Sequence, residues 1–211
     1  MAPLISPPPD GTVDGMESMA GWAYLLIFVL LVLDCLIPAV PAETSVIAGG
    51  ALAASGHLHV AVVLLTSVSA VVAGDLLMHE AARRGGRRLV ERFLRGERYG
   101  KVVSRVARLL DRRGGAIVAA GRFVPLGRTT VALVSGYAQF PRRRFLPAII
   151  VGAVLWSLYI VGLGYLGGNV FSGNPLAAAG LGVALSLLVT GVTTVAQRLR
   201  LRWRAAGQPV M

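Results

Sequence analysis

Four ionisable side chains lie inside strongly apolar stretches of the sequence: Glu43, Asp75, Arg122 and Arg128. A charged side chain costs about 2.5–3.5 kcal/mol to insert into a membrane core, so such residues are functional candidates by default. The planar guanidinium group of arginine matches the oxygens of a phosphate. A carboxylate that burial makes hard to ionise can bind and release a proton. We therefore interpret Arg122 and Arg128 as substrate-binding residues, and Glu43 and Asp75 as proton-coupling residues that can neutralise the arginines.

Each of these residues also has a structural interpretation. Glu43 could cap a helix at the membrane surface, and the two arginines could anchor the chain by reaching toward lipid head groups. The glycines and the proline around Arg122 and Arg128 favour a binding role instead. His79 follows Asp75 by four residues and so lies on the same helical face, where a local pair is one alternative and simple packing the other.

Signatures of an enzyme are absent from the sequence. It contains no phosphate-binding loop, no zinc-protease motif, no serine-hydrolase elbow and no cysteine pair for a metal. Its single cysteine, Cys35, cannot form an internal disulfide. His57 and His59 are too few ligands for a metal site. We therefore expect no catalytic residues, no cofactor, no metal and no enzymatic activity.

The composition points to a membrane. Hydrophobic residues make up 55% of the chain and charged residues only 15%, whereas soluble domains carry about 25% charged residues. The net charge of +11 would alone suggest nucleic acid, but the 21 Lys and Arg are segregated. None precedes Arg83, and the rest cluster mainly at 83–113, 142–144 and 198–204. Such clustering marks cytoplasmic loops of a membrane protein, so we expect no nucleic-acid partner.

Four segments are apolar and long enough to cross a membrane, which takes about 20 residues. They cover 22–40, 58–82, 145–170 and 176–197. The sequence therefore predicts an all-α, polytopic membrane protein with about four transmembrane helices.

Two further segments, near 38–56 and 115–140, combine apolar arms with prolines, glycines and charges. A broken backbone of this kind is tolerated in a membrane only where other helices cover it. We therefore expect two re-entrant hairpins that enter from opposite sides of the membrane.

The remaining segments complete the predicted organisation. Residues 1–19 are expected to form a disordered tail, 20–197 a membrane domain, and 198–211 a basic cytoplasmic tail. Apolar residues recur at helical spacing among the bases of 83–113, which predicts an amphipathic segment on the anionic cytoplasmic surface. With two opposed hairpins, all basic clusters and the N-terminus would be cytoplasmic. A full span at 38–55 would instead move the N-terminus outward.

The two predicted hairpins share a short sequence echo. Val40-Pro41-Ala42-Glu43-Thr44 and Val124-Pro125-Leu126-Gly127-Arg128-Thr129 both read Val-Pro, then a charge, then Thr, and an apolar run ending at a glycine follows each, at Gly50 and Gly136. Inverted repeats whose broken helices meet in mid-membrane would have this pattern.

Between Asp34 and Gly168 the chain resembles the DedA family, also called the SNARE-associated or VTT-domain family. The first part of the resemblance consists of Pro38-Ala39-Val40-Pro41-Ala42-Glu43, Ala48-Gly49-Gly50 and Gly74-Asp75, with Arg83 and Gly86. Its most specific part is Gly121-Arg122-Phe123-Val124-Pro125-Leu126-Gly127-Arg128-Thr129, followed by Gly136, Phe145, Gly152, Trp156 and Gly164-Tyr165-Leu166-Gly167-Gly168.

The resemblance implies a bacterial plasma-membrane protein with two opposed re-entrant hairpins that moves lipids between leaflets. The lipid is undecaprenyl phosphate in some members and phosphatidylethanolamine or another phospholipid in others, with ties to envelope homeostasis and to the proton motive force. By motif position, it also implies that Glu43, Asp75, Arg122 and Arg128 are essential. Two residues depart from the family pattern: His79 replaces a usual tyrosine, and Ala82 replaces a usual glycine.

The hypothesis from the sequence is a proton-coupled transporter of a lipid or lipid-linked phosphate. Its expected partners are membrane lipids, anionic head groups and protons. The sequence leaves open whether the protein forms a homo-oligomer. Three alternatives remain: a small-anion transporter that uses the same charges, a scaffolding membrane protein whose charges only stabilise the hairpins, and a membrane enzyme that acts on lipid phosphate. The lack of a nucleophile–base set disfavours the enzyme.

Overall fold

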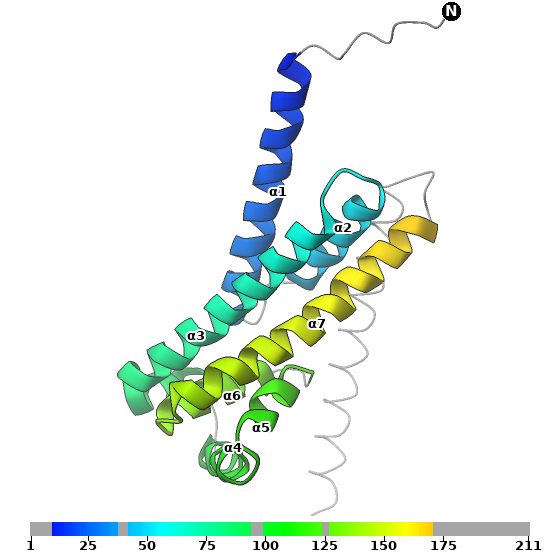
Figure 1. Cartoon of the computed structure of the whole chain (residues 1–211). Coiled ribbons are helices and arrows are strands. Elements are labelled where there is room, and N and C mark those ends of the chain that lie inside the picture. Colours follow the sequence, from blue (N-terminus) through cyan, green and yellow to red (C-terminus); the bar gives the residue numbers. More distant parts are fainter. Residues whose placement is uncertain (1–9, 38–41, 94–98, 124–126, 171–211) are drawn as a thin grey trace, which may run out of the picture.

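The computed structural model describes residues 10–37, 42–93, 99–123 and 127–170 (Figure 1). These residues form helices and contain no strand, which confirms the predicted all-α class. The helices are α1 (Asp10–Leu36), α2 (Ala42–Ala54), α3 (Val60–Phe93), α4 (Tyr99–Arg113), α5 (Gly115–Gly121), α6 (Gly127–Tyr137) and α7 (Arg142–Val170).

Three of these helices contain apolar runs long enough to cross a membrane: Met19–Leu36 in α1, Val60–Gly86 in α3 and Arg142–Asn169 in α7. They coincide with three of the four predicted spans, and the chain is a multi-pass membrane protein. The fourth predicted span, 176–197, lies outside the described residues. α2 is apolar but too short to cross a membrane.

The predicted hairpin near 115–140 corresponds to two short helices, α5 and α6, that flank residues 124–126. Within the predicted hairpin near 38–56, residues 42–54 form one uninterrupted helix, α2, and residues 38–41 lie outside the described residues. An alanine- and glycine-rich helix of this kind can pack closely on its neighbours.

α1 and α3 run parallel to each other. The Tyr24 hydroxyl of α1 accepts a hydrogen bond from the backbone N–H of His59 at 2.9 Å, just before α3 begins. Toward the other ends of the two helices, Cys35 packs against Gly74. Tyr24, midway along α1, therefore lies beside the α2–α3 turn. The start of α1 extends beyond that turn and away from the start of α7, where Arg142 pairs with Glu80 of α3 (Figure 1).

This parallel course contradicts the prediction that the N-terminus shares the side of the basic clusters. α2 brings the chain back to the side where α1 began, and α3 then runs toward the basic end. No Lys or Arg precedes Arg83, so the sequence offered no charge that fixes this end. α1 also begins at Asp10, inside the segment 1–19 expected to be disordered. Acidic residues near a helix N-terminus favour such an extension.

Two three-helix units repeat in opposite orientation: α1–α2–α3 and α5–α6–α7. In each unit a short central helix packs against the long final helix of the other unit, α2 against α7 and α6 against α3. The helices approach closely at two glycines, since Gly50 abuts the backbone of Val161 and Gly136 abuts the backbone of His79. These are the glycines that end the two halves of the sequence echo, so the packing supports an inverted repeat.

α4 lies below α5 and α6 at the basic end of the molecule (Figure 1). Leu110 is buried, and Val103 and Val106 pack against the same apolar cluster, while Lys101 and Arg105 are exposed. The chain reaches α4 after a sharp kink in α3 at Gly86, whose φ of 56° is in the left-handed region that glycine adopts at low cost.

Candidate functional site

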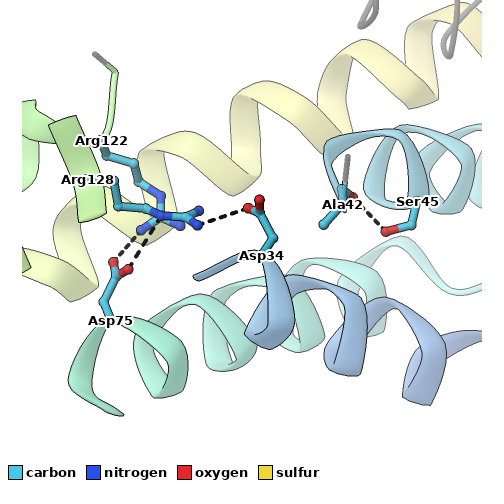
Figure 2. A network of polar contacts seen from close by, with 6 residues as sticks. All are labelled: Asp34, Ala42, Ser45, Asp75, Arg122 and Arg128. Atoms are coloured by element: carbon cyan, nitrogen blue, oxygen red, sulfur yellow. Dashed lines mark hydrogen bonds and ion pairs between the residues drawn. The ribbon is translucent and has the colours of Figure 1, made fainter. Parts of the chain in front are cut away.

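Three of the four predicted site residues meet at the centre of the structure, each from a different element (Figure 2). Asp75 lies on α3, Arg122 directly follows α5, and Arg128 is in the first turn of α6. Arg122 Nη1 donates a hydrogen bond to Asp75 Oδ2 at 2.6 Å, and Arg128 Nε lies 3.6 Å from Asp75 Oδ1. One carboxylate therefore pairs with both arginines of the broken α5–α6 segment.

Asp34 is the fourth member of the cluster, and the sequence analysis did not include it. Arg128 Nη2 donates a hydrogen bond to Asp34 Oδ2 at 2.9 Å, which links α6 to the last turn of α1 (Figure 2). The signal was present in the sequence, since Asp34 is an acid near the end of an apolar span. Only the course of α1 beside α3 shows that it faces the site.

Glu43 does not take the place predicted for it among the ion pairs. It lies in the first turn of α2, half-buried, and no described residue forms an ion pair with it. It still lies within electrostatic reach of the cluster, because the charges of Asp34, Arg122 and Arg128 act on it. Figure 2 shows that the start of α2, marked by Ala42 and Ser45, faces Asp34.

The four side chains of the cluster differ in their exposure to solvent. The side chains of Arg122 and Asp75 are 3% and 7% exposed, whereas those of Arg128 and Asp34 are 16% and 18% exposed. Two positive and two negative charges balance, and their attraction is stronger in a poorly polarisable interior than in water. The Arg122–Asp75 pair is thus occluded, while the Arg128–Asp34 pair borders the accessible surface.

Arg122 leaves one edge of its guanidinium group without a partner. Its Nη1 contacts Asp75, and the group lies 5.1 Å from the ring centroid of Trp156 on α7, a cation–π contact. Nε and Nη2 are buried and form no hydrogen bond with the described residues. Because these two N–H groups share one side of the planar fork, they can bind two oxygens of an anion together. Buried donors without partners are rare in proteins and call for such an explanation.

No metal-ligand set accompanies these charges in the part of the chain that the structure describes. No set of three or more His, Cys, Asp or Glu side chains gathers there at metal-binding distance. His57, one of the two histidines considered from the sequence, bonds through Nδ1 to the Ser55 hydroxyl in an exposed turn. The arrangement is suited to holding an anion and to exchanging ion pairs.

Comparison with known proteins adds a family context. Residues 40–166 match the VTT domain. Protein DedA of Escherichia coli K12 is 24% identical over 191 residues, which cover 88% of this chain and 87% of DedA. The inner membrane protein YohD of the same strain is 31% identical over 130 residues, or 62% of this chain and 66% of YohD. An uncharacterized membrane protein of Mycobacterium tuberculosis H37Rv is 31% identical over 150 residues, covering 69% and 65% of the two chains. No solved structure matches the chain.

Proposed function

Because the chain belongs to the DedA family of VTT-domain membrane proteins, we propose that it moves a lipid phosphate between the leaflets of the bacterial plasma membrane. The substrate class is a polyprenyl phosphate or a phospholipid, and the movement is coupled to protons and supports the envelope. The basic ends of α3, α4 and α7 face the cytoplasm in this proposal, following the positive-inside rule.

The observation that carries the proposal is the unpaired edge of Arg122. A membrane-embedded arginine with two parallel N–H groups that have no partner among the described residues offers a bidentate site for phosphate oxygens. Trp156 covers the face of the guanidinium group and Asp75 fixes its far side, so the group needs little reorganisation to bind an anion. A simple membrane anchor would instead direct its charge toward the surface.

Movement of the substrate follows from an exchange of partners. A head-group phosphate held on the free edge of Arg122 competes with Asp34 and Asp75 for Arg128. A carboxylate that loses its arginine in an apolar setting takes up a proton, because an unpaired buried charge is costly. Release of the phosphate restores the ion pair and expels the proton. Glu43, which lacks an ion-pair partner among the described residues, is free to accept a proton without breaking a bond.

The charged residues lie at the ends of helices, and these ends give the lipid a place to pass. Asp34 is in the last turn of α1, Glu43 is in the first turn of α2, Arg122 directly follows α5 and Arg128 is in the first turn of α6. We propose that the re-entrant hairpins predicted near 38–56 and 115–140 meet here in mid-membrane, where half-helices create binding sites in other transporters. The head group would cross there while its chains remain in lipid.

Reconstitution in liposomes tests this function. Leaflet exchange of labelled polyprenyl phosphate, phosphatidylethanolamine and a phosphate-free lipid is measured with and without a proton gradient, beside uptake of inorganic phosphate. Selective exchange of phosphate-bearing lipids that responds to the gradient supports the proposal. Uptake of inorganic phosphate without lipid exchange would indicate a small-anion transporter. Neither activity from a folded protein would indicate a scaffold, and release of phosphate from the lipid would indicate an enzyme.

A further inference from the structure

His79 is a buried, polar side chain that the proposed transport cycle does not use. Its side chain lies among α3, α6 and α7, and the residue is 0% exposed. The imidazole stacks on the ring of Phe145 with centroids 4.2 Å apart, and Nδ1 lies 2.9 Å from the hydroxyl of Ser135 on α6. The alternative of a local pair between His79 and Asp75 is therefore replaced by a contact between helices.

The hydrogen bonds around Ser135 fix the protonation of the imidazole. The Ser135 hydroxyl donates its hydrogen to the carbonyl oxygen of Ala132 at 2.9 Å, so it can only accept from His79. Nδ1 therefore carries the hydrogen, and Nε2 of a neutral ring carries a lone pair. Nε2 is buried and has no hydrogen-bond partner among the described residues.

This contact lies on the faces of α3 and α6 that form the charged site. His79 follows Asp75 by four residues on α3, and Ser135 follows Arg128 by seven residues on α6. Both spacings keep the residues on one face of a helix. Directly beside this contact, Gly136 packs against the backbone of His79 so closely that a side chain there would collide with it. The His79–Ser135 bond is thus placed to set how α6 presents Arg128 to Asp75.

We propose that His79 is a positioning residue for the charged site, which holds α6 in register against α3 while the imidazole is neutral and releases it when the imidazole is protonated. A second proton would turn Nε2 into a buried donor without an acceptor. From α3, Glu80 favours and Arg83 opposes the added charge, and from α7 Arg142 opposes it. Arg142 already pairs with Glu80 through hydrogen bonds, so Glu80 is not free to compensate a charge on His79. On α6 the contact of the imidazole is the Ser135 hydroxyl, which carries no charge. Protonation of His79 would therefore separate α6 from α3.

The proposal rests on the proposed function for its consequence in transport, but its structural part is tested without transport. Spin labels are placed at Leu65 on α3 and at Ala138 just after α6, both exposed, in a Cys35→Ala background. Their distance distribution is measured in liposomes at about pH 7.5 and about pH 4.5, a range that extends below the usual titration of histidine because a buried imidazole resists the second proton. The labelled protein with His79 and Ser135 intact should give a narrow distance distribution at the higher pH and a shifted or broadened one at the lower pH.

Substitutions at the two partners give opposite expectations. His79→Asn keeps a donor near the position of Nδ1 but cannot be protonated, so its distribution should stay narrow at both pH values. Ser135→Ala removes the acceptor and should broaden the distribution at both. Two controls should behave like the unsubstituted protein: Ser67→Ala, which removes a buried hydroxyl that donates to the Val63 carbonyl oxygen of its own helix, and His57→Asn, at an exposed turn.

Three results would overturn the proposal: a wild-type distribution that does not respond to pH, a response that persists in His79→Asn, or an unchanged distribution in Ser135→Ala. Leaflet exchange measured on the same samples separates the two ideas. Absence of lipid exchange with a pH-dependent distance would reject the proposed function and leave the positioning role intact. Lipid exchange together with a spin-label distance that does not change with pH would reject the positioning role alone.

Discussion

Asp75 is the residue on which both arginines depend. It pairs with Arg122 at 2.6 Å and lies 3.6 Å from Arg128, and its side chain is 7% exposed. Asp34 pairs only with Arg128 and is 18% exposed. Because a buried arginine left without its partner is strongly unfavourable, the two acids should differ in their contribution to stability even though both are aspartates in ion pairs.

We expect Asp75→Asn to destabilise the protein by about 3–5 kcal/mol, the usual cost of breaking a buried ion pair. Asp34→Asn should cost about 1 kcal/mol, because its pair is partly exposed and Arg128 keeps Asp75 as a partner. Unfolding in mixed micelles measures both values, with Asp111→Asn on the exposed face of α4 as the reference for removing a carboxylate. Equal losses for Asp34→Asn and Asp75→Asn would contradict the central position of Asp75.

Glu43→Gln should separate folding from transport. Since no described residue forms an ion pair with Glu43, the substitution should leave the melting temperature near that of the wild type. If Glu43 carries the coupled proton, lipid exchange should be lost or should no longer respond to a proton gradient. Exchange in liposomes and thermal unfolding in detergent are measured on the same preparation. Wild-type exchange with an intact response to the gradient would remove Glu43 from the mechanism.

For individual residues, the sequence predicted which charged side chains are buried better than it predicted which of them form ion pairs. The cost of burying charge singled out Asp75, Arg122 and Arg128, because that cost depends only on the apolar surroundings of each residue. It could not assign the ion pairs. Asp34 and Glu43 are both acids beside a break, and only the position of α1 beside α3 decides that Asp34, rather than Glu43, contacts Arg128.

Among the elements, the contacts of α2 with α7 and of α6 with α3 depend on glycines. A methyl group at Gly50 would collide with the backbone of Val161, and one at Gly136 would collide with the backbone of His79. Backbone atoms cannot move aside as a flexible side chain can, so the helices themselves would have to separate. Close helix contacts through small residues are a general means of packing in membranes.

Gly50→Ala and Gly136→Ala should therefore each destabilise the protein by about 1–3 kcal/mol, the typical cost of overpacking. Gly162→Ala is the matched control, because Gly162 lies in α7 and nothing lies within 4 Å of a methyl group built there. That substitution should be neutral or stabilising by up to about 1 kcal/mol, since alanine favours helix. Thermal unfolding compares all three, and a harmless Gly136→Ala would show that α6 does not approach α3 as described.

The elements themselves were largely predictable. Apolar length identified the cores of α1, α3 and α7, and proline with glycine marked both breaks. The sequence could not show that 42–54 forms a single helix, because an apolar segment of that length fits either one helix or a hairpin with two short arms. The choice depends on how closely Gly49 and Gly50 pack against α1, α3 and α7, which is a tertiary property.

The whole molecule is an inverted pair of three-helix units, and this arrangement sets which ends share a side. α1 and α3 start on one side, and the Glu80–Arg142 contact lies toward the other. The short Val-Pro echo indicated a repeat, but a hydrophobic pattern has the same period in either direction and cannot give the direction of a helix. The side of the N-terminus was therefore predicted wrongly, although three of the four predicted spans coincide with the long apolar helices and the fourth lies outside the described residues.

Cysteine labelling tests this arrangement directly. Single cysteines replace Met19, His57 or Arg143, all exposed, in a Cys35→Ala background. An impermeant maleimide should reach Met19→Cys and His57→Cys from one side of the membrane and Arg143→Cys from the other. Labelling of Met19→Cys and Arg143→Cys from the same side would contradict the parallel course of α1 and α3.

The central claim is that the free edge of Arg122 holds the phosphate of a lipid during its transfer. The most direct test is the exchange rate of polyprenyl phosphate in liposomes for the wild type, Arg122→Lys and, as a control, Arg143→Lys at an exposed site. Lysine keeps the charge beside Asp75 but lacks the two parallel N–H groups, a loss of about 1.5–3 kcal/mol for hydrogen bonds to a charged group. We predict exchange at least about tenfold slower in folded Arg122→Lys and unchanged in Arg143→Lys. Exchange at the wild-type rate in Arg122→Lys, or no exchange by the wild type, would contradict the claim.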